Sequence, residues 1–245
     1  MPPPTIVIVP GLWLGSRPYE LLVEEMKKLA PSLTEFIYAP LISTGTCSPG
    51  NPTMYDDAMG IRGIIKPLVE AGKRLVIVGH SAGAFLSAMA TEDLEVGGKF
   101  AAPSGGSGGG GVERFVFIAG GILPLGAPHP ELDFLDVRGG EAYCRTPDEL
   151  LFHDVEPAVA AKYESFFKCQ PAEGWAGDCT YCGWEKVPSS YILTEHDRVV
   201  PPHVQEACAA IAQSDVIRIP TGHLPMLSDP KLLAEKVVGC LGLDA

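Results

Sequence analysis

Short apolar runs alternate with amphipathic stretches along most of this chain. The runs are rich in Val and Ile, which is typical of strands buried on both faces of a sheet. They occupy residues 5–9, 36–39, 75–78, 112–119, 190–194 and 216–219. Apolar positions recur at helical spacing at residues 18–29, 55–71, 85–90, 203–212 and 230–241. This alternation predicts an α/β fold, with a mainly parallel sheet of about six strands and helices on both faces.

A glycine-rich stretch at residues 97–111, GGKFAAPSGGSGGGG, interrupts the alternation. It offers almost no side chain to bury and its glycines are costly to order, so we expect a flexible loop. The functional alternative is a phosphate-binding loop. The stretch lacks the Lys-Ser/Thr ending of a P-loop, which favours the plain loop.

A second interruption runs from residue 120 to residue 188, with repeated prolines, scattered aromatic residues and one helical pattern at 156–167. It is too long and irregular for an ordinary connection between two elements. We therefore predict that residues 122–188 form a cap inserted over the sheet. The remaining segments, 1–121 and 189–245, then form the α/β core.

The sequence Gly-His-Ser-Ala-Gly at 79–83 directly follows the strand predicted at 75–78. A strand, a G-x-S-x-G turn and a helix make a nucleophile elbow, in which a sharp turn lifts the serine hydroxyl above the sheet edge. Glycine suits positions 79 and 83 because a side chain there would collide with neighbouring backbone. We therefore expect Ser81 to be a nucleophile, rather than a structural serine in a tight turn.

A serine hydroxyl needs a base within hydrogen-bond reach and a carboxylate that orients this base. His223 follows the last predicted strand and Asp197 follows the one before it, so both should lie at the same sheet edge as Ser81. We predict that His223 is the base and Asp197 the acid, against the alternative of an ordinary loop histidine. The competing carboxylates are Glu195, Asp133 and Asp136.

Such a site also needs two backbone N–H groups that hold the negative charge developing on the substrate oxygen. Ala82 follows the nucleophile at the start of a predicted helix, where N–H groups lack intrahelical partners. The second donor should come from the loop after the first strand, and Leu12 is the best candidate. We therefore predict an oxyanion hole formed by the N–H groups of Leu12 and Ala82.

The formal net charge of −12, without a block of basic residues, argues against a nucleic-acid or anionic-membrane partner. No apolar run approaches the roughly 20 residues that span a bilayer, and no export signal is visible, so we expect a cytoplasmic protein. The seven cysteines should then be reduced thiols, and we expect no bound metal. The alternatives are a disulfide or a tetrathiolate zinc site of Cys179, Cys182, Cys144 and Cys169.

Four segments carry a resemblance to a known family: V-P-G-L-W at 9–13, G-H-S-A-G-A at 79–84, SSYILTEHDRVVP at 189–201 and GHLPMLSDP at 222–230. They resemble α/β-hydrolases of the group that includes plant methylesterases and hydroxynitrile lyases, and more closely fungal relatives of that group. The resemblance implies an α/β-hydrolase fold and a Ser-Asp-His order along the chain. Similar proteins usually begin the first motif with His-Gly, whereas Pro10 stands in the place of that histidine here.

We therefore expect a cofactor-independent serine hydrolase that cleaves a carboxylic ester, or a lactone, of a small and moderately apolar molecule. We also expect a monomer or a homodimer. The cap should shape the substrate pocket, whose candidate lining residues are Trp13, Phe134, Phe152 and Phe166.

Two other functions remain open. One is a lyase or a C–C bond-forming cyclase that uses the same triad. The lyases that the chain resembles employ a cap lysine, for which the candidates are Lys162, Lys168 and Lys186. The other is a ligand receptor with residual hydrolase activity.

Overall fold

The computed structural model describes residues 3–101 and 109–242. Its centre is a six-stranded sheet in the order β2-β1-β3-β4-β8-β9, in which every neighbouring pair is parallel. The strands are β1 (Thr5–Val9), β2 (Phe36–Tyr38), β3 (Arg74–His80), β4 (Gly111–Ile118), β8 (Ser189–Thr194) and β9 (Asp215–Ile219). The predicted mainly parallel sheet is thus confirmed, and each strand lies within one or two residues of its apolar run.

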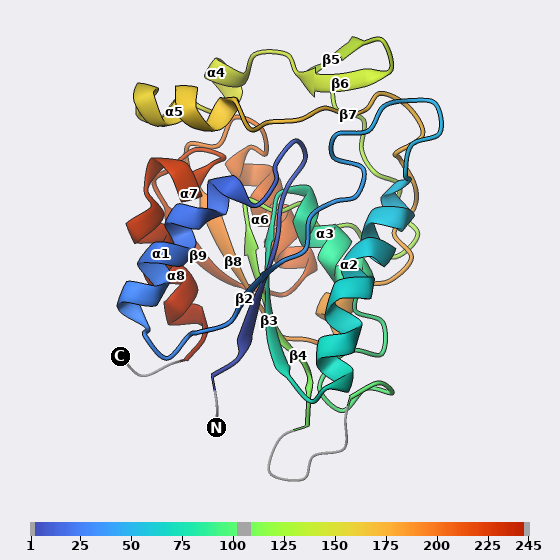
Figure 1. Ribbon diagram of the computed structural model, residues 1–245, viewed down its shortest axis with the longest axis vertical. Coiled ribbons are helices and arrows are strands. Elements are labelled where there is room, and N and C mark those ends of the chain that lie inside the picture. Colours follow the sequence, from blue (N-terminus) through green and yellow to red (C-terminus); the bar gives the residue numbers. More distant parts are fainter. Residues whose placement is uncertain (1–2, 102–108, 243–245) are drawn as a thin grey trace.

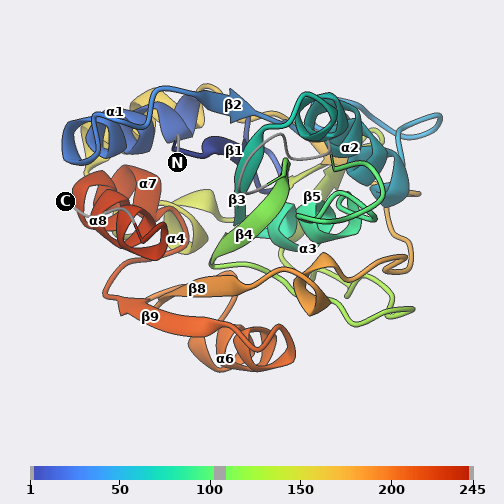
Figure 2. The same cartoon turned by 90° about the horizontal axis from the view of Figure 1, so that it is seen from below.

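Helices cover both faces of this sheet. They are α1 (Glu20–Leu29), α2 (Met54–Glu70), α3 (Ala82–Met89), α6 (Pro202–Ile211), α7 (Pro225–Ser228) and α8 (Pro230–Cys240). Figure 2 shows α1 and α8 on one side, with α2, α3 and α6 on the other. Two short 3-10 helices, at Arg17–Tyr19 and Gly183–Glu185, complete this set. Among the described residues, none of the helices is long and apolar enough to cross a membrane.

The alternating side chains of the strands build two separate cores. In β1, Val7 and Val9 pack with the helices α2, α3 and α6, whereas Ile6 and Ile8 pack with α1 and α8. All four side chains are fully buried, as expected of a parallel strand between two helical layers. The sheet is therefore held rigidly from both sides, and its carboxyl-end loops are free to carry chemistry.

Residues 122–188, which the sequence predicts to be a cap and which are called the cap below, have more regular structure than their sequence pattern indicates. The cap contains α4 (Pro147–Leu150) and α5 (Pro157–Glu164), the latter inside the helix predicted at 156–167. It also contains a three-stranded antiparallel sheet of β5 (Leu135–Arg138), β6 (Glu141–Cys144) and β7 (Gln170–Pro171), which the pattern did not predict. These elements lie together across the top of the molecule in Figure 1.

A sequence signal for this small sheet exists in the turn between β5 and β6. Arg138 pairs with Glu141, so that Gly139 and Gly140 form a two-residue hairpin loop. Both glycines have positive φ angles, +57° and +88°, as a type I′ turn requires. The Gly-Gly pair between two short mixed runs could therefore have identified the hairpin.

The glycine-rich stretch falls largely outside the described residues. Residues 102–108 are not described, so the flexible loop predicted at 97–111 stays a prediction there. The described flanks form turns and bends, and Gly111 already belongs to β4.

Candidate active site

Ser81 occupies the turn between β3 and α3 with φ 52° and ψ −123°, a backbone conformation that L-residues rarely adopt. Two glycines make this turn possible through close packing. A Cβ at Gly83 would lie 2.4 Å from the carbonyl oxygens of Val9 and Pro10, and one at Gly79 would lie 2.8 Å from the Cα of Ala84. Neither position can accept a side chain without moving backbone, so the nucleophile elbow geometry follows directly from the G-x-S-x-G sequence.

The structure brings the three predicted catalytic side chains together. His223 Nε2 lies 3.1 Å from Ser81 Oγ, and His223 Nδ1 lies 2.8 Å from Asp197 Oδ2. His223 and Asp197 are both buried, 3% and 5% exposed. With Nδ1–H donating to the carboxylate, Nε2 is left to accept the serine proton, as a general base must.

Asp197 is held as an ionised carboxylate despite its burial. Its Oδ1 accepts the N–H groups of Val199 and Val200, at 2.8 and 2.9 Å. Its Oδ2 accepts Thr194 Oγ1 and Gln205 Nε2 in addition to His223. Burial pushes the pKa of Asp197 upward, but the charge of His223 and these hydrogen bonds outweigh it and leave the pKa below its usual value.

The competing carboxylates lie elsewhere. Glu195 is exposed, and its N–H group belongs to the backbone bond with Ile219. Asp136 pairs with Arg138 on the cap, and Asp133 lies at the cavity described below. The hydrogen bond to His223 goes to Asp197, and its role as the catalytic acid stays a prediction.

The two predicted oxyanion-hole residues, Leu12 and Ala82, line the same cavity as Ser81. Ala82 is the first residue of α3, where backbone N–H groups point out of the helix. The loop after β1 approaches the serine very closely, because a Cβ at Gly11 would lie 2.8 Å from the Ser81 Cβ. Both loops are thus placed where donors to a substrate oxygen are needed, and the donor roles stay a prediction.

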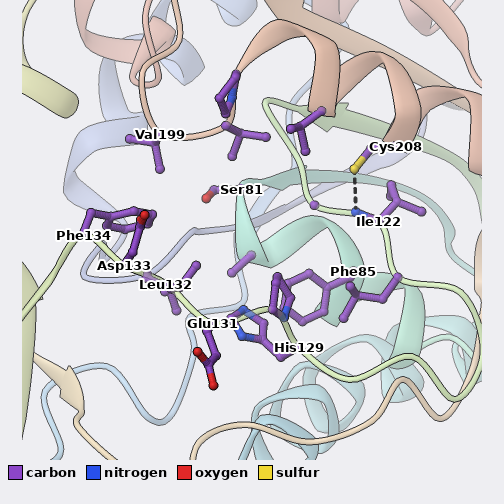
Figure 3. Close-up of a pocket in the computed structure, with 18 of the residues that line it drawn as sticks. Ser81, Phe85, Ile122, His129, Glu131, Leu132, Asp133, Phe134, Val199 and Cys208 are labelled. Atoms are coloured by element: carbon purple, nitrogen blue, oxygen red, sulfur yellow. Dashed lines mark hydrogen bonds between the residues drawn. The ribbon is translucent and has the colours of Figure 1, made fainter.

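A cavity of about 550 Å³ opens beside Ser81 (Figure 3). Its wall is mostly apolar and comes from the loop after β1, helices α3 and α6, the cap and the loop after Asp197. The lining residues include Leu12, Trp13, Phe85, Ile122, Leu123, Leu132, Phe134, Val199, Val200 and Cys208. A cavity of this size and character suits a drug-sized apolar molecule.

Of the four aromatic residues predicted to bind substrate, Trp13 and Phe134 line this cavity. The other two predictions, Phe152 and Phe166, are wrong in position. Phe152 is buried against Phe167 at the junction of the cap with the core, with ring centroids 5.2 Å apart. Phe166 packs against the Tyr163 ring and the Arg17 guanidinium on the outside of the cap. Phe152 is buried and Phe166 lies at the surface, 36% exposed, and the sequence alone does not distinguish either place from a pocket wall.

The sequence analysis missed His129 as a cavity residue. Its ring packs on Phe85 and Trp175, with centroids 5.6 and 4.8 Å away, and it faces the cavity below Ser81 (Figure 3). Burial lowers the pKa of His129 to about 4, against the opposing effect of the Pro130 carbonyl, so the ring is neutral near pH 7. No local pattern around a Pro-flanked histidine in an irregular segment signals this placement.

Two neighbouring cap residues, His153 and Asp154, contact the loops that carry Asp197 and His223. His153 Nε2 lies 2.8 Å from the carbonyl oxygen of His196, beside Asp197. Asp154 accepts the N–H group of Gly222, beside His223. A Cβ at Gly222 would lie 2.4 Å from the His153 ring, so glycine allows this close contact. The docking of the cap is therefore tied to the positions of Asp197 and His223.

All seven cysteines are free thiols. Cys179 and Cys182 lie close together, with their sulfur atoms 3.8 Å apart. Within the described residues, no group of three or more His, Cys, Asp or Glu side chains is placed to hold a metal ion, so the four thiols do not gather into a tetrathiolate cluster.

A sequence profile of the alpha/beta hydrolase family matches residues 6–236. The chain belongs to this family. It is similar to the alpha/beta hydrolase nvfD of Aspergillus novofumigatus, with 28% identity over 98% of this chain and 97% of the relative. This confirms the resemblance to α/β-hydrolases and to fungal relatives that the four motifs carry.

Solved structures of other proteins share the fold of this alpha/beta hydrolase. A pyrethroid hydrolase from Sphingobium faniae superimposes with a TM-score of 0.70 and 17% identity, over 97% of both chains. The methylesterase MES16 from Arabidopsis gives a TM-score of 0.67 and 13% identity, over 97% of this chain and 98% of that one. At these identities the likeness concerns the fold, and it confirms the α/β-hydrolase architecture of the chain.

Proposed function

We propose that this alpha/beta hydrolase is a serine esterase that cleaves a carboxylic ester, or a lactone, of a small and moderately apolar molecule. The observation that carries the proposal is the continuous hydrogen-bond chain from Ser81 through His223 to Asp197, with the serine at the wall of an apolar cavity. The methylesterase and the pyrethroid hydrolase among the proteins of similar fold support a hydrolytic reaction.

In the proposed reaction, Ser81 Oγ attacks the substrate carbonyl carbon while His223 Nε2 takes the hydroxyl proton. The N–H groups of Leu12 and Ala82 stabilise the negative oxygen of the tetrahedral intermediate. His223 then gives its proton to the leaving alkoxide, which departs as an alcohol and leaves an acyl group on Ser81. A water molecule, deprotonated by His223, releases the acid and restores the serine.

The proposed substrate class follows from the cavity. Its walls offer Trp13 and Phe134, whose rings contact each other edge to face at 6.2 Å, together with the aliphatic side chains around them. Polar recognition at the cavity can come from the neutral ring of His129 and from the charged side chains of Glu131, Asp133 and Arg198. The apolar part of the wall favours a largely apolar substrate with few hydrogen-bonding groups.

None of the three lysines considered for a lyase is among the residues that line the cavity. Lys162 lies over the Tyr163 ring, and Lys186 pairs with Glu95 at 3.2 Å. The Lys168 side chain runs past Gly45. Ester hydrolysis therefore has more support in the arrangement of side chains than a lysine-assisted lyase reaction.

The test uses a fluorophosphonate probe and a series of p-nitrophenyl esters. The wild-type protein should be labelled at Ser81 and should hydrolyse these esters, whereas Ser81→Ala should lose both activities. Ser87→Ala is the matched control, because Ser87 lies on the same helix and bonds to the Ala84 carbonyl away from the cavity. Ester turnover by Ser81→Ala within roughly tenfold of wild type would contradict the assignment.

A further inference from the structure

A second hydrogen-bond chain runs underneath the triad. The Gly11 N–H group lies 3.4 Å from the Tyr19 hydroxyl oxygen, this oxygen lies 2.9 Å from His80 Nδ1, and His80 Nε2 lies 2.8 Å from the His223 carbonyl oxygen. Tyr19 and His80 are completely buried, with no exposed surface. The chain therefore connects three segments of the active site that are far apart in sequence.

The groups at the two ends of this hydrogen-bond chain determine which atom donates in each of its hydrogen bonds. A backbone N–H group can only donate and a carbonyl oxygen can only accept. His80 must therefore carry its proton on Nε2, where it donates to His223. The free Nδ1 of the neutral ring accepts the Tyr19 hydroxyl proton, and the tyrosine oxygen accepts the Gly11 N–H group.

The ionisation of both side chains agrees with this arrangement. Burial, followed by the nearby His223 ring, lowers the pKa of His80 to about 3, although the hydrogen bond to the His223 carbonyl and the charge of Asp197 act in the opposite direction. Burial also raises the pKa of Tyr19 well above its usual value. Near neutral pH the two groups thus keep the forms that satisfy all of their hydrogen bonds.

We infer that Tyr19 and His80 are positioning residues for catalysis, which set the oxyanion-hole loop and the catalytic base in register with the nucleophile. His80 precedes Ser81 at the end of β3 and holds the backbone of His223. Tyr19 holds the N–H group of Gly11, next to the proposed donor Leu12. This inference rests on the proposed esterase function.

Such positioning matters because catalysis requires the reacting groups to be placed accurately. Catalytic groups lose much of their effect when they move by about 1 Å, and the loops after β1 and β9 contain no regular structure that would hold them to this tolerance. A rigid buried bridge between them supplies the constraint. It also explains why a histidine inside the elbow points away from the cavity and into the interior.

The experiment compares Tyr19→Phe with Tyr163→Phe. Tyr19→Phe removes a single oxygen atom from the bridge and keeps the buried ring. Tyr163→Phe is the matched control, since Tyr163 is a buried tyrosine at the junction of cap and core. We expect Tyr19→Phe to lower kcat for a p-nitrophenyl ester by roughly 10- to 100-fold with KM changed by less than about threefold, because the lost positioning acts in the transition state.

A transition-state analogue separates positioning from general loss of structure. The affinity of Tyr19→Phe for an arylboronic acid should fall in parallel with kcat, while its affinity for the carboxylate product should stay close to that of wild type. His80→Gln, which keeps a side-chain N–H donor for the His223 carbonyl, should retain more activity than His80→Leu. A kcat of Tyr19→Phe within twofold of wild type, or an equal loss in Tyr163→Phe, would overturn the inference.

Nitrogen NMR of the histidine rings tests the bridge independently of ester hydrolysis. His80 should remain neutral and protonated on Nε2 from about pH 8 to pH 5 in the wild-type protein, and a charged ring or a proton on Nδ1 would overturn the inference. A wild-type protein that neither hydrolyses esters nor reacts with the fluorophosphonate would instead contradict the proposed function. In that case the inferred catalytic role of the bridge would also be contradicted. The NMR result would still decide whether the bridge itself exists.

Discussion

Asp197 receives four hydrogen bonds besides that of His223: from the N–H groups of Val199 and Val200, from Thr194 Oγ1 and from Gln205 Nε2. Together with the charge of the His223 ring, this shell keeps a buried carboxylate ionised. It also fixes the direction of Oδ2, which the His223 ring needs in order to hold its proton on Nδ1. The orientation of the His223 ring is thus determined by groups at the end of β8, in the loop that follows it and in helix α6.

We predict that Asp197→Asn lowers kcat for ester hydrolysis by about 10³- to 10⁴-fold, by analogy with serine proteases, because an amide favours the wrong tautomer of His223. Steady-state kinetics of the purified variant measure this effect. Glu195→Gln is the matched control on the same loop, and its kcat should stay close to wild type since Glu195 is exposed. The opposite ranking of the two variants would transfer the acid role to Glu195.

At the scale of elements, the cap and the loop after β1 pack together and form one wall of the cavity. The indole N–H group of Trp13 donates to the Ala142 carbonyl in β6 at 3.0 Å, and the Trp13 ring contacts Phe134, next to β5. Trp13 holds a positive φ of 65°, which an L-residue keeps only when its surroundings fix it. The small antiparallel sheet of the cap therefore positions side chains that line the cavity.

Alanine substitutions of Phe134 and Phe152 should have different effects, the first on ester preference and the second on the free energy of unfolding. Phe134→Ala enlarges the cavity, so kcat/KM for a bulky ester relative to a small ester should change by roughly 1–3 kcal/mol in transition-state free energy. Phe152→Ala should lower the free energy of unfolding by about 3–5 kcal/mol, because Phe152 is 4% exposed and its removal leaves a void. Ester kinetics and urea unfolding of both variants measure the two effects. If Phe152→Ala changed the ester preference more than Phe134→Ala did, the assignment of the cavity wall would be wrong.

For the whole molecule, two buried neutral histidines couple stability to pH. The pKa of His80 is lowered to about 3 and that of His129 to about 4, in both cases chiefly by burial. In the unfolded chain both return to an ordinary value near 6.5, so the unfolded state binds more protons below this pH. The stability that the two rings contribute is complete above about pH 6.5 and is lost as the pH falls toward about 4.

We therefore predict that the free energy of unfolding falls between about pH 6.5 and pH 5, with a slope approaching about 1.4 kcal/mol per pH unit for each histidine. Urea unfolding at several pH values measures the slope, in a range where most carboxylates remain ionised. His129→Phe keeps an aromatic ring against Phe85 and Trp175 and should reduce the slope by about one proton. A slope that is flat in wild type, or unchanged in this variant, would contradict the prediction.

The sequence by itself determined the sheet, the helices that cover it and the placement of the three proposed catalytic residues. Strands buried on both faces read as continuous apolar runs, so β1, β3 and β4 are visible without any tertiary information. The turn at Ser81 is visible because Gly79 and Gly83 are required by backbone contacts that any such turn makes. In a parallel sheet the carboxyl ends of the strands meet at one edge, which is why Asp197 and His223 could be placed beside Ser81.

The tertiary structure alone decided which cap residues face the cavity and what holds the triad in place. Phe134 lines the cavity, Phe152 is buried in the core and Phe166 lies at the surface of the cap. The sequence does not distinguish these places, because an aromatic ring is stabilised by burial in a core and in a pocket wall alike. His129 enters the cavity through an irregular segment that has no periodicity to interpret. The contacts of His80 with Tyr19 and His223 span 61 and 143 residues of sequence, and such distances are closed only when the helices and the last strand have packed.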